Sequence, residues 1–219
     1  MAEVPPELFR RQDETADERF YVEPRLLAHI DDEAIAALGR FLRDLVPDDA
    51  DVLDLMSAYL SHLPEDVRAR CRRVAGLGMN DEEMAANSQL TDHLIHNLNT
   101  DPHLPYEDAS FDVALCTVSV QYLLHPVDVF REVGRVLRPN GPFVVSFSNR
   151  CFPTKAIAAW LYFDDMRHGQ LVQRYFEDSA CWRHATLTDL SPHPGRSDPL
   201  YAVWARKGSL GTLACDGAS

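Results

Sequence analysis

The sequence predicts an α/β protein whose mostly parallel β-sheet carries helices on both faces. Short apolar runs alternate along the chain with stretches in which apolar residues recur at helical spacing. That alternation is typical of helices that connect parallel strands. The 219 residues also suffice for one large domain that buries a two-sided sheet.

The expected strands are short and apolar, and they span residues 51–55, 73–77, 93–97, 112–117, 142–148, 185–190 and 200–206. Each of the expected helices has an apolar face of its own. They span residues 31–45, 64–71, 81–86, 126–137, 154–163 and 168–178. In the first of these helices Leu38, Leu42 and Leu45 share a face, and Asp31 or Asp32 can cap its start. Asn140 and Gly141 form a turn after helix 126–137, because both residues tolerate positive φ.

The two ends of the chain differ in pattern from the middle. Residues 1–18 are charged, contain Pro5 and Pro6 and show no periodicity, so we expect a mobile, loosely attached segment. Residues 19–207 are expected to form a single domain, and residues 208–219 a flexible tail.

Composition argues against several classes of partner. The chain has 21 basic and 34 acidic residues, a formal net charge of −13 that repels the phosphates of nucleic acids. A small, uncharged or cationic partner fits better. The longest apolar run, residues 113–124, is too short to cross a membrane, and the N-terminus lacks a signal-peptide core, so we expect a cytoplasmic protein.

No metal site is expected either. The five cysteines are widely spread without a CxxC pair, which signals neither a disulfide framework nor a zinc site. His93, His96 and His103 lie close together in sequence, but residues three apart on a strand point to opposite faces.

Three separated segments between Leu104 and Arg150 carry a resemblance: LPYEDASFD, QYLLHP and RVLRPNG. In order and spacing they resemble the class I S-adenosylmethionine-dependent methyltransferases of the type-11 kind, over roughly residues 35–206. The resemblance implies a Rossmann-like, seven-stranded sheet in which strand 200–206 is antiparallel. It also implies an enzyme that transfers the methyl group of S-adenosylmethionine to a small-molecule acceptor.

The cofactor loop departs from the family's pattern. Family members have a glycine-rich loop after the first strand and an acid, which binds ribose, at the end of the second. In DVLDLMSAYLSHLP, at residues 51–64, the glycine places hold Met56, Ala58 and Leu60, and Gly78 stands in place of the acid. The side chains of Met56, Ala58 and Leu60 keep other atoms further from the backbone than a glycine would.

The resemblance still assigns cofactor-binding roles to residues at the ends of the first four strands. They are Asp54, Met56, Ser57, Ser61, Gly78, Met79, Asn80, Asn97, Leu98, Asn99, Val118 and Gln121. Within this set, Asn97 and Asn99 can accept a hydrogen bond from the adenine amine, and Asn80 can replace the ribose acid. The hydroxyls of Ser57 and Ser61 can hold the cofactor's carboxylate.

Three residues are candidates for catalysis, each with a plainer alternative. His62 can act as an acid or base, or be a structural hydrogen-bonding residue. Tyr122 follows the fourth strand where family members place residues near the methyl group, or it packs the following helix. Arg150 can orient an anionic acceptor, or be a solvated loop residue.

Further candidates for the acceptor side are Tyr21, Arg25 and Asn149, and a few of the aromatic residues between strands five and six. The missing glycines and acid also keep a second hypothesis open. In it the chain has a degenerate cofactor loop and acts as a binding or regulatory subunit, or catalyses chemistry other than methyl transfer.

Overall fold

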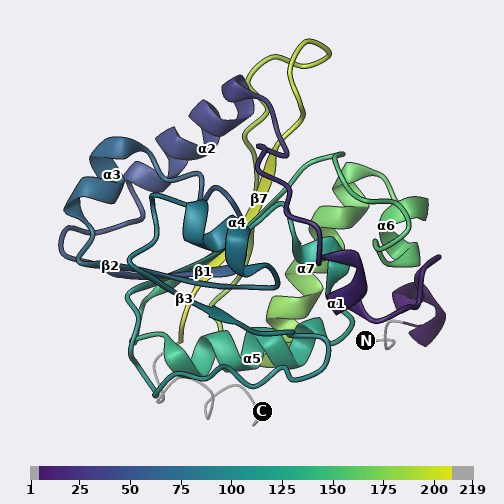
Figure 1. The fold of residues 1–219 in the computed structure, drawn as a ribbon, viewed down its shortest axis with the longest axis horizontal. Helices are drawn as coiled ribbons and strands as arrows, with labels where there is room; N and C mark the ends of the chain where they lie inside the picture. Colours follow the sequence, from purple (N-terminus) through teal and green to yellow (C-terminus); the bar gives the residue numbers. More distant parts are fainter. Residues whose placement is uncertain (1–4, 209–219) are drawn as a thin grey trace, which may run out of the picture.

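The computed structural model describes residues 5–208 and contains a seven-stranded sheet between two layers of helices (Figure 1). The sheet order is β3-β2-β1-β4-β5-β7-β6. Neighbours from β3 to β5 pair in parallel, whereas β7 is antiparallel to both β5 and β6. The predicted fold class is confirmed, including the antiparallel strand at 201–206.

The strands are β1 (Asp51–Ser57), β2 (Arg73–Gly78), β3 (Asp92–Ile95), β4 (Val113–Thr117), β5 (Pro142–Phe147), β6 (Thr186–Asp189) and β7 (Tyr201–Arg206). The α-helices are α1 (Asp17–Phe20), α2 (Asp32–Arg43), α3 (Glu65–Arg70), α4 (Asp81–Ala86), α5 (Pro126–Val136), α6 (Ala158–Tyr162) and α7 (Asp165–Ser179). Two short 3-10 helices are η1 (Pro6–Phe9) and η2 (Val120–Tyr122).

Each face of the sheet has its own apolar core. Helices α5 and α7 cover one face, where Phe130 of α5 meets Phe176 of α7 with ring centroids 4.8 Å apart. Helices α2 and α3 cover the other face (Figure 1). Alternate β1 residues serve the two cores, Leu53 the first and Val52 the second, because successive side chains of a strand point to opposite faces. This explains why β1 is apolar throughout most of its length.

One predicted helix is shorter than its pattern suggested. Of residues 154–163, only Ala158–Tyr162 is helical. The backbone N–H of Ile157 donates to Gln121 O at 3.0 Å, and that of Ala158 donates to Arg10 O at 2.7 Å. These N–H groups bind other parts of the chain, so the first turn of the predicted helix does not form.

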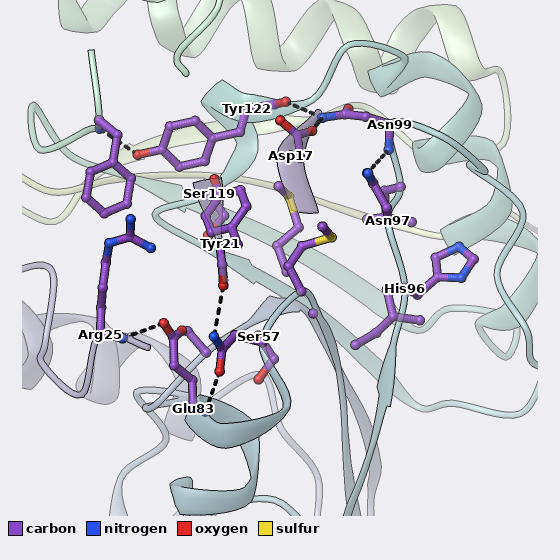
Figure 2. Close-up of a pocket in the computed structure, with 18 of the residues that line it drawn as sticks. Asp17, Tyr21, Arg25, Ser57, Glu83, His96, Asn97, Asn99, Ser119 and Tyr122 are labelled. Atoms are coloured by element: carbon purple, nitrogen blue, oxygen red, sulfur yellow. Dashed lines mark hydrogen bonds between the residues drawn. The ribbon is translucent and has the colours of Figure 1, made fainter. Parts of the chain in front are cut away.

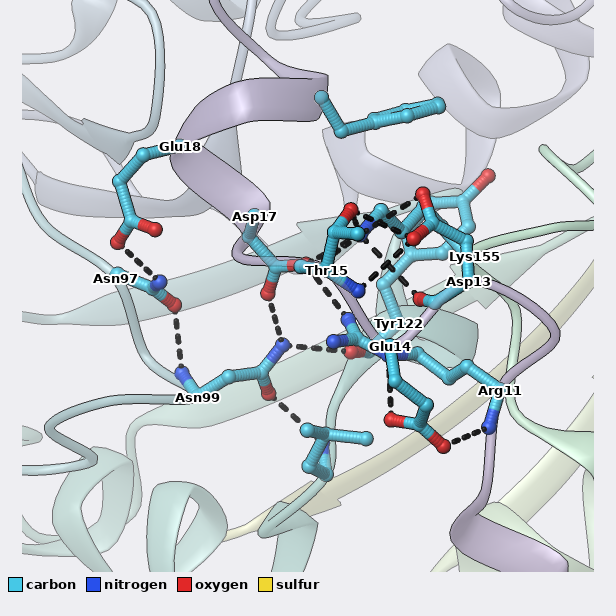
Figure 3. A network of polar contacts seen from close by, with 12 residues as sticks. Arg11, Asp13, Glu14, Thr15, Asp17, Glu18, Asn97, Asn99, Tyr122 and Lys155 are labelled. Carbon is cyan, nitrogen blue, oxygen red and sulfur yellow. Dashed lines mark hydrogen bonds and ion pairs between the residues drawn. The ribbon is translucent and has the colours of Figure 1, made fainter.

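The described part of the N-terminal segment, residues 5–18, packs on the domain although the sequence predicted loose attachment. Lys155, which has no exposed surface, donates to Thr15 O at 2.6 Å and lies 3.2 Å from Asp13 Oδ2 (Figure 3). Asp17 is also buried and pairs with Arg11 at 2.7 Å. The mobility of residues 1–18 and the boundaries of the single domain stay predictions, and all but one residue of the expected C-terminal tail lies outside the described range.

A β-bulge ends β1 at the place where the family pattern is broken. The register with β2 shifts between Leu55 and Ser57, so Met56 is an extra residue, and its φ is 55°. Ser57 then pairs with Gly78, where an added Cβ would lie 2.1 Å from the Ser57 carbonyl oxygen. No side chain fits at position 78. The glycine-poor loop and the missing ribose acid are therefore one structural feature.

We predict that Gly78→Ala lowers the free energy of unfolding by about 2 kcal/mol, because the backbone of Ser57 must shift to admit the new methyl group. The measurement is denaturant unfolding followed by circular dichroism. Gly208→Ala is the matched control: its Cβ would lie 3.5 Å from Cys181 O, an ordinary contact, and should change stability by less than about 0.5 kcal/mol. Equal stabilities of the two variants would contradict the steric argument.

Candidate active site

A cavity lies where β1 to β4 end, beneath the N-terminal segment, which is taken from here on to extend to residue 29 (Figure 2). Parallel strands of an α/β sheet direct their carboxyl ends to one edge, and ligands bind there next to the reversal of strand order. Here the reversal falls between β1 and β4. The sequence-predicted residues that line this cavity are Met56, Ser57, Gly78, Met79, Asn80, Asn97, Leu98, Asn99 and Tyr122.

Two of the predicted cofactor ligands lie beneath the cavity. Asp54 is 2% exposed and accepts a 2.6 Å hydrogen bond from the hydroxyl of Ser57. Burial raises the pKa of Asp54 to about 6, against the opposing effect of the Ser57 and Ser61 hydroxyls. Ser61 is fully buried and accepts from Asn87 Nδ2 at 3.0 Å. These side chains stabilise the bulge, and their hydroxyls are already bonded within the protein.

His62 and Gln121 also lie outside the residues that line the cavity. His62 is 6% exposed, and burial lowers its pKa to about 4, so its imidazole is neutral. Neither of its ring nitrogens has a hydrogen-bond partner among residues 5–208. Gln121 is fully buried and donates to Val118 O at 2.9 Å. The structure does not bring these two side chains to the site.

The asparagines after β3 join the cavity to the N-terminal segment (Figure 3). Asn97 donates to Glu18 Oε1 at 2.7 Å. Asn99 donates to Asp17 Oδ2 and to Tyr122 O, both at 2.9 Å, and accepts from Leu124 N at 2.8 Å. Both N–H groups of the Asn99 side chain therefore already donate hydrogen bonds to other residues of the protein.

Asn80 holds the start of α4. Its side-chain oxygen accepts from Glu83 N at 2.9 Å, and its amide nitrogen donates to Tyr21 O at 2.8 Å and to Val22 O at 3.2 Å. This is the arrangement of a helix N-cap whose remaining protons bind a neighbouring segment. The amide that was predicted to replace the ribose acid is therefore bonded elsewhere in this structure.

Glu83 is a lining residue that the sequence reasoning missed. It is 6% exposed, and its Oε1 accepts from the backbone N–H of Arg25 at 2.6 Å (Figure 2). Burial raises the pKa of Glu83 above its ordinary value. Within residues 5–208 its Oε2 has no hydrogen-bond partner. The sequence carries no signal for it, because Asp81, Glu82 and Glu83 are three consecutive acids, of which the structure buries only Glu83.

The N-terminal segment narrows this cavity to about 80 Å³. Sites for small molecules measure about 300–1,000 Å³. Tyr21 and Arg25 of this segment line the cavity, and the Arg25 guanidinium lies 4.7 Å from the ring centroid of Phe20 and 5.1 Å from that of Phe152. A ligand as large as a nucleoside needs this segment to move outward.

A second cavity of about 300 Å³ adjoins the first. It contains two more of the predicted residues, Val118 and Arg150, together with Tyr122. Arg150 donates to Asp198 at 2.9 Å. Of the aromatic residues between β5 and β6, Phe152 lines both cavities, whereas Trp160, Tyr175 and Phe176 are core residues. His29, which the sequence reasoning also missed, lines both cavities as well.

Within residues 5–208 no group of three histidine, cysteine or acidic side chains is placed to hold a metal ion. His93 lies 2.9 Å from Asp81, and His103 lies 2.9 Å from Glu132, so each has its own acidic partner. The same part of the chain contains no helix with the length and apolar character of a membrane span.

The fold is α/β, and its cavity lies at the carboxyl edge of the sheet, where proteins of this class bind their ligands. Comparison with known families gives a match to the methyltransferase domain over residues 56–145. The chain is also similar to malonyl-[acyl-carrier protein] O-methyltransferase of Marinomonas sp., with 29% identity over 148 residues, which is 65% of this chain and 54% of the relative. The chain thus spans about half the length of this curated relative.

Among solved structures, an S-adenosylmethionine-dependent methyltransferase from Mesorhizobium loti superposes with a TM-score of 0.54 at 18% identity, covering 78% of this chain and 98% of that one. The [4+2]-cyclase SpnF superposes with a TM-score of 0.60 at 15% identity, covering 86% of each chain. The match over residues 56–145 supports the resemblance that the central segments predicted, and the superpositions show the class I methyltransferase fold.

We predict that Asp54 makes stability fall as pH rises from about 4 to about 6. With the pKa raised to about 6, the folded protein keeps a proton in this window that the unfolded chain, with an ordinary pKa of 3.8, has released. The unfolding free energy then drops by about 2 to 3 kcal/mol across the window. Denaturant unfolding at several pH values should show this drop in the wild type relative to Asp54→Asn.

The control for that experiment is Asp66→Asn, because Asp66 is exposed and pairs with the exposed Arg43. Its effect on the pH dependence should be much smaller than that of Asp54→Asn, because solvent screens an exposed pair. If wild type and Asp54→Asn keep a constant stability difference between pH 4 and 7, Asp54 does not hold a proton in the folded state.

Proposed function

We propose that this protein transfers a methyl group from S-adenosylmethionine to a small-molecule acceptor. The match to the methyltransferase domain and the place of the cavity at the carboxyl ends of β1 to β4 support S-adenosylmethionine as the cofactor. When bound, its sulfonium supplies an already activated methyl group. The protein's own contribution is then to align donor and acceptor and to receive a proton where the acceptor must lose one.

The observation that carries this proposal is the Glu83 carboxylate, whose Oε1 accepts a hydrogen bond within residues 5–208 while its Oε2 does not. Class I family members place the ribose acid at the end of β2, but Ser57 O excludes every side chain from position 78. Glu83 supplies a buried acid to the same cavity from α4, and its Oε2 is left for a ligand. A carboxylate oxygen accepts hydrogen bonds strongly, so it suits the hydroxyls of a ribose.

Other lining residues suit the rest of the cofactor. Leu77, Met79 and Leu98 give the cavity the apolar surface that a purine ring needs. The backbone of residues 56–58, which follows the bulge, would hold the methionine part. The N-terminal segment must move outward for the cofactor to enter, because its side chains reduce the space to about 80 Å³.

The second cavity supports the proposal that the acceptor is a small molecule. Its volume of about 300 Å³ lies in the range of sites for small ligands, and it shares a wall with the cofactor cavity. The net charge of −13 disfavours a nucleic-acid acceptor.

A second candidate function is chemistry other than methyl transfer, or a binding role, on the same scaffold. It is motivated by the rebuilt cofactor loop and by the structural likeness to the [4+2]-cyclase SpnF. Methyl transfer and this alternative differ in whether bound S-adenosylmethionine is consumed, which mass spectrometry of the bound ligand follows directly.

We predict that the wild type binds S-adenosylhomocysteine and that Glu83→Gln weakens this binding about tenfold or more, because a buried carboxylate makes stronger hydrogen bonds than an amide. Isothermal titration calorimetry measures both affinities. Glu82→Gln is the matched control, since Glu82 is the exposed neighbour on the same helix.

Two results would count against these assignments, and they are separable. Absence of heat and of any thermal shift at millimolar ligand with the wild type would refute the proposed function. Equal affinities of wild type and Glu83→Gln would remove Glu83 from the site and leave the proposed function intact.

A further inference from the structure

Three side chains form the wall that the two cavities share: His29, Tyr122 and Phe152. A methyl donor bound in the first cavity and an acceptor bound in the second would meet at this wall. Its polar groups are therefore the ones that can touch the reacting atoms.

His29 is the wall residue whose polar atoms remain available. Its ring packs against the edge of Phe152, with centroids 5.6 Å apart and planes at 84°. No hydrogen bond or ion pair joins it to another residue in the range 5–208. The hydroxyl of Tyr122, in contrast, accepts from Phe152 N at 2.8 Å.

Protonation separates His29 from two other titratable groups that line these cavities, Tyr21 and Cys151. Burial, and after it the Arg25 cation, lower the pKa of His29 below its ordinary value, so the imidazole is unprotonated at neutral pH. Burial raises the pKa of the Tyr21 hydroxyl and of the Cys151 thiol, which therefore keep their protons. Among these three, His29 alone can accept one.

The titratable and charged groups that face His29 come from four parts of the chain. They are Arg25 on its own segment, His62 after β1, Tyr122 on η2, and Arg150 and Cys151 after β5. The Arg25 cation opposes protonation of His29 in the free protein and stabilises an anion beside it, whereas Arg150 is already paired with Asp198.

The walls of the second cavity suit a flat aromatic ring. Tyr122 and Phe152 stack with centroids 6.0 Å apart and planes at 26°. Leu27, Ala28 and Val118 add apolar surface, and the one charged side chain among the lining residues is Arg150. Aromatic and apolar walls with few polar groups are typical of sites for small aromatic ligands.

We propose that the second cavity binds a phenolic acceptor and that His29 is the general base that takes the proton of its hydroxyl. The inference rests on the proposed function for its methyl donor. As the phenolic oxygen forms its bond to the methyl carbon, the carbon–sulfur bond breaks and its electron pair stays on sulfur. The hydroxyl proton passes to His29, which afterwards releases it to water, and S-adenosylhomocysteine and the methyl ether are the products.

The test uses 4-nitrophenol as a coloured probe, because its phenolate absorbs where the phenol does not. The wild-type protein, saturated with S-adenosylhomocysteine, should bind the probe and raise its apparent acid dissociation constant by about tenfold, since His29 takes the proton of the neighbouring phenol. In His29→Gln the probe should still bind, but its acid dissociation constant should change by less than about twofold. His184→Gln is the matched control, an exposed histidine that lines neither cavity, and should behave as the wild type.

Each departure from this pattern has its own meaning. Lack of saturable probe binding to the wild type would overturn the assignment of the second cavity. A phenolate signal in His29→Gln equal to that of the wild type would overturn the role of His29, provided that circular dichroism and thermal melting show the variant to be folded. Calorimetry with S-adenosylhomocysteine on the same samples reports on the proposed function separately.

Discussion

The contact between the Ser57 carbonyl and Gly78 is the constraint on which the rest of the site depends. Met56 is the bulged residue that brings this carbonyl against β2, and the absence of a Cβ at position 78 makes room for it. Asp54 and Ser61 fix the same turn from beneath through buried hydrogen bonds. A family position that usually carries an acid is thereby closed to every residue but glycine, and Glu83 is the acid that the cavity has instead.

Buried polar contacts hold the N-terminal segment in place, whereas apolar contacts stabilise the sheet. Lys155 is completely enclosed, and its ammonium group is satisfied by carbonyl oxygens and by the carboxylates of Asp13 and Asp17. Removing one member of such a group leaves an uncompensated buried charge, which costs far more than the pair contributes. This is why a segment with few apolar residues can lie in one defined place over the cavity.

The sequence predicted the fold well because strand order and helix placement follow from apolar patterns and from the segments between Leu104 and Arg150. It also predicted nine of the residues that line the first cavity, since these follow the strands in a regular way. The contacts that it did not predict join residues that are distant in sequence. The amides of Asn97 and Asn99 bind Glu18 and Asp17, some 80 residues away in the chain, and no local pattern reveals such pairs.

The same limitation explains why Glu83 and His29 were missed. Glu83 matters only because the Ser57 carbonyl occupies the space beside Gly78, a contact between two strands. His29 lies in a stretch without periodicity, and its position between two cavities comes from the path of the N-terminal segment over the sheet.

That path couples the two cavities mechanically. Tyr21 and Arg25 close the first cavity, while Leu27, Ala28 and His29, a few residues further along the same stretch of backbone, form one side of the second. Glu83 fastens this stretch through the backbone of Arg25. A movement that widens the first cavity therefore also shifts one side of the second, and the two compartments cannot change shape independently of each other.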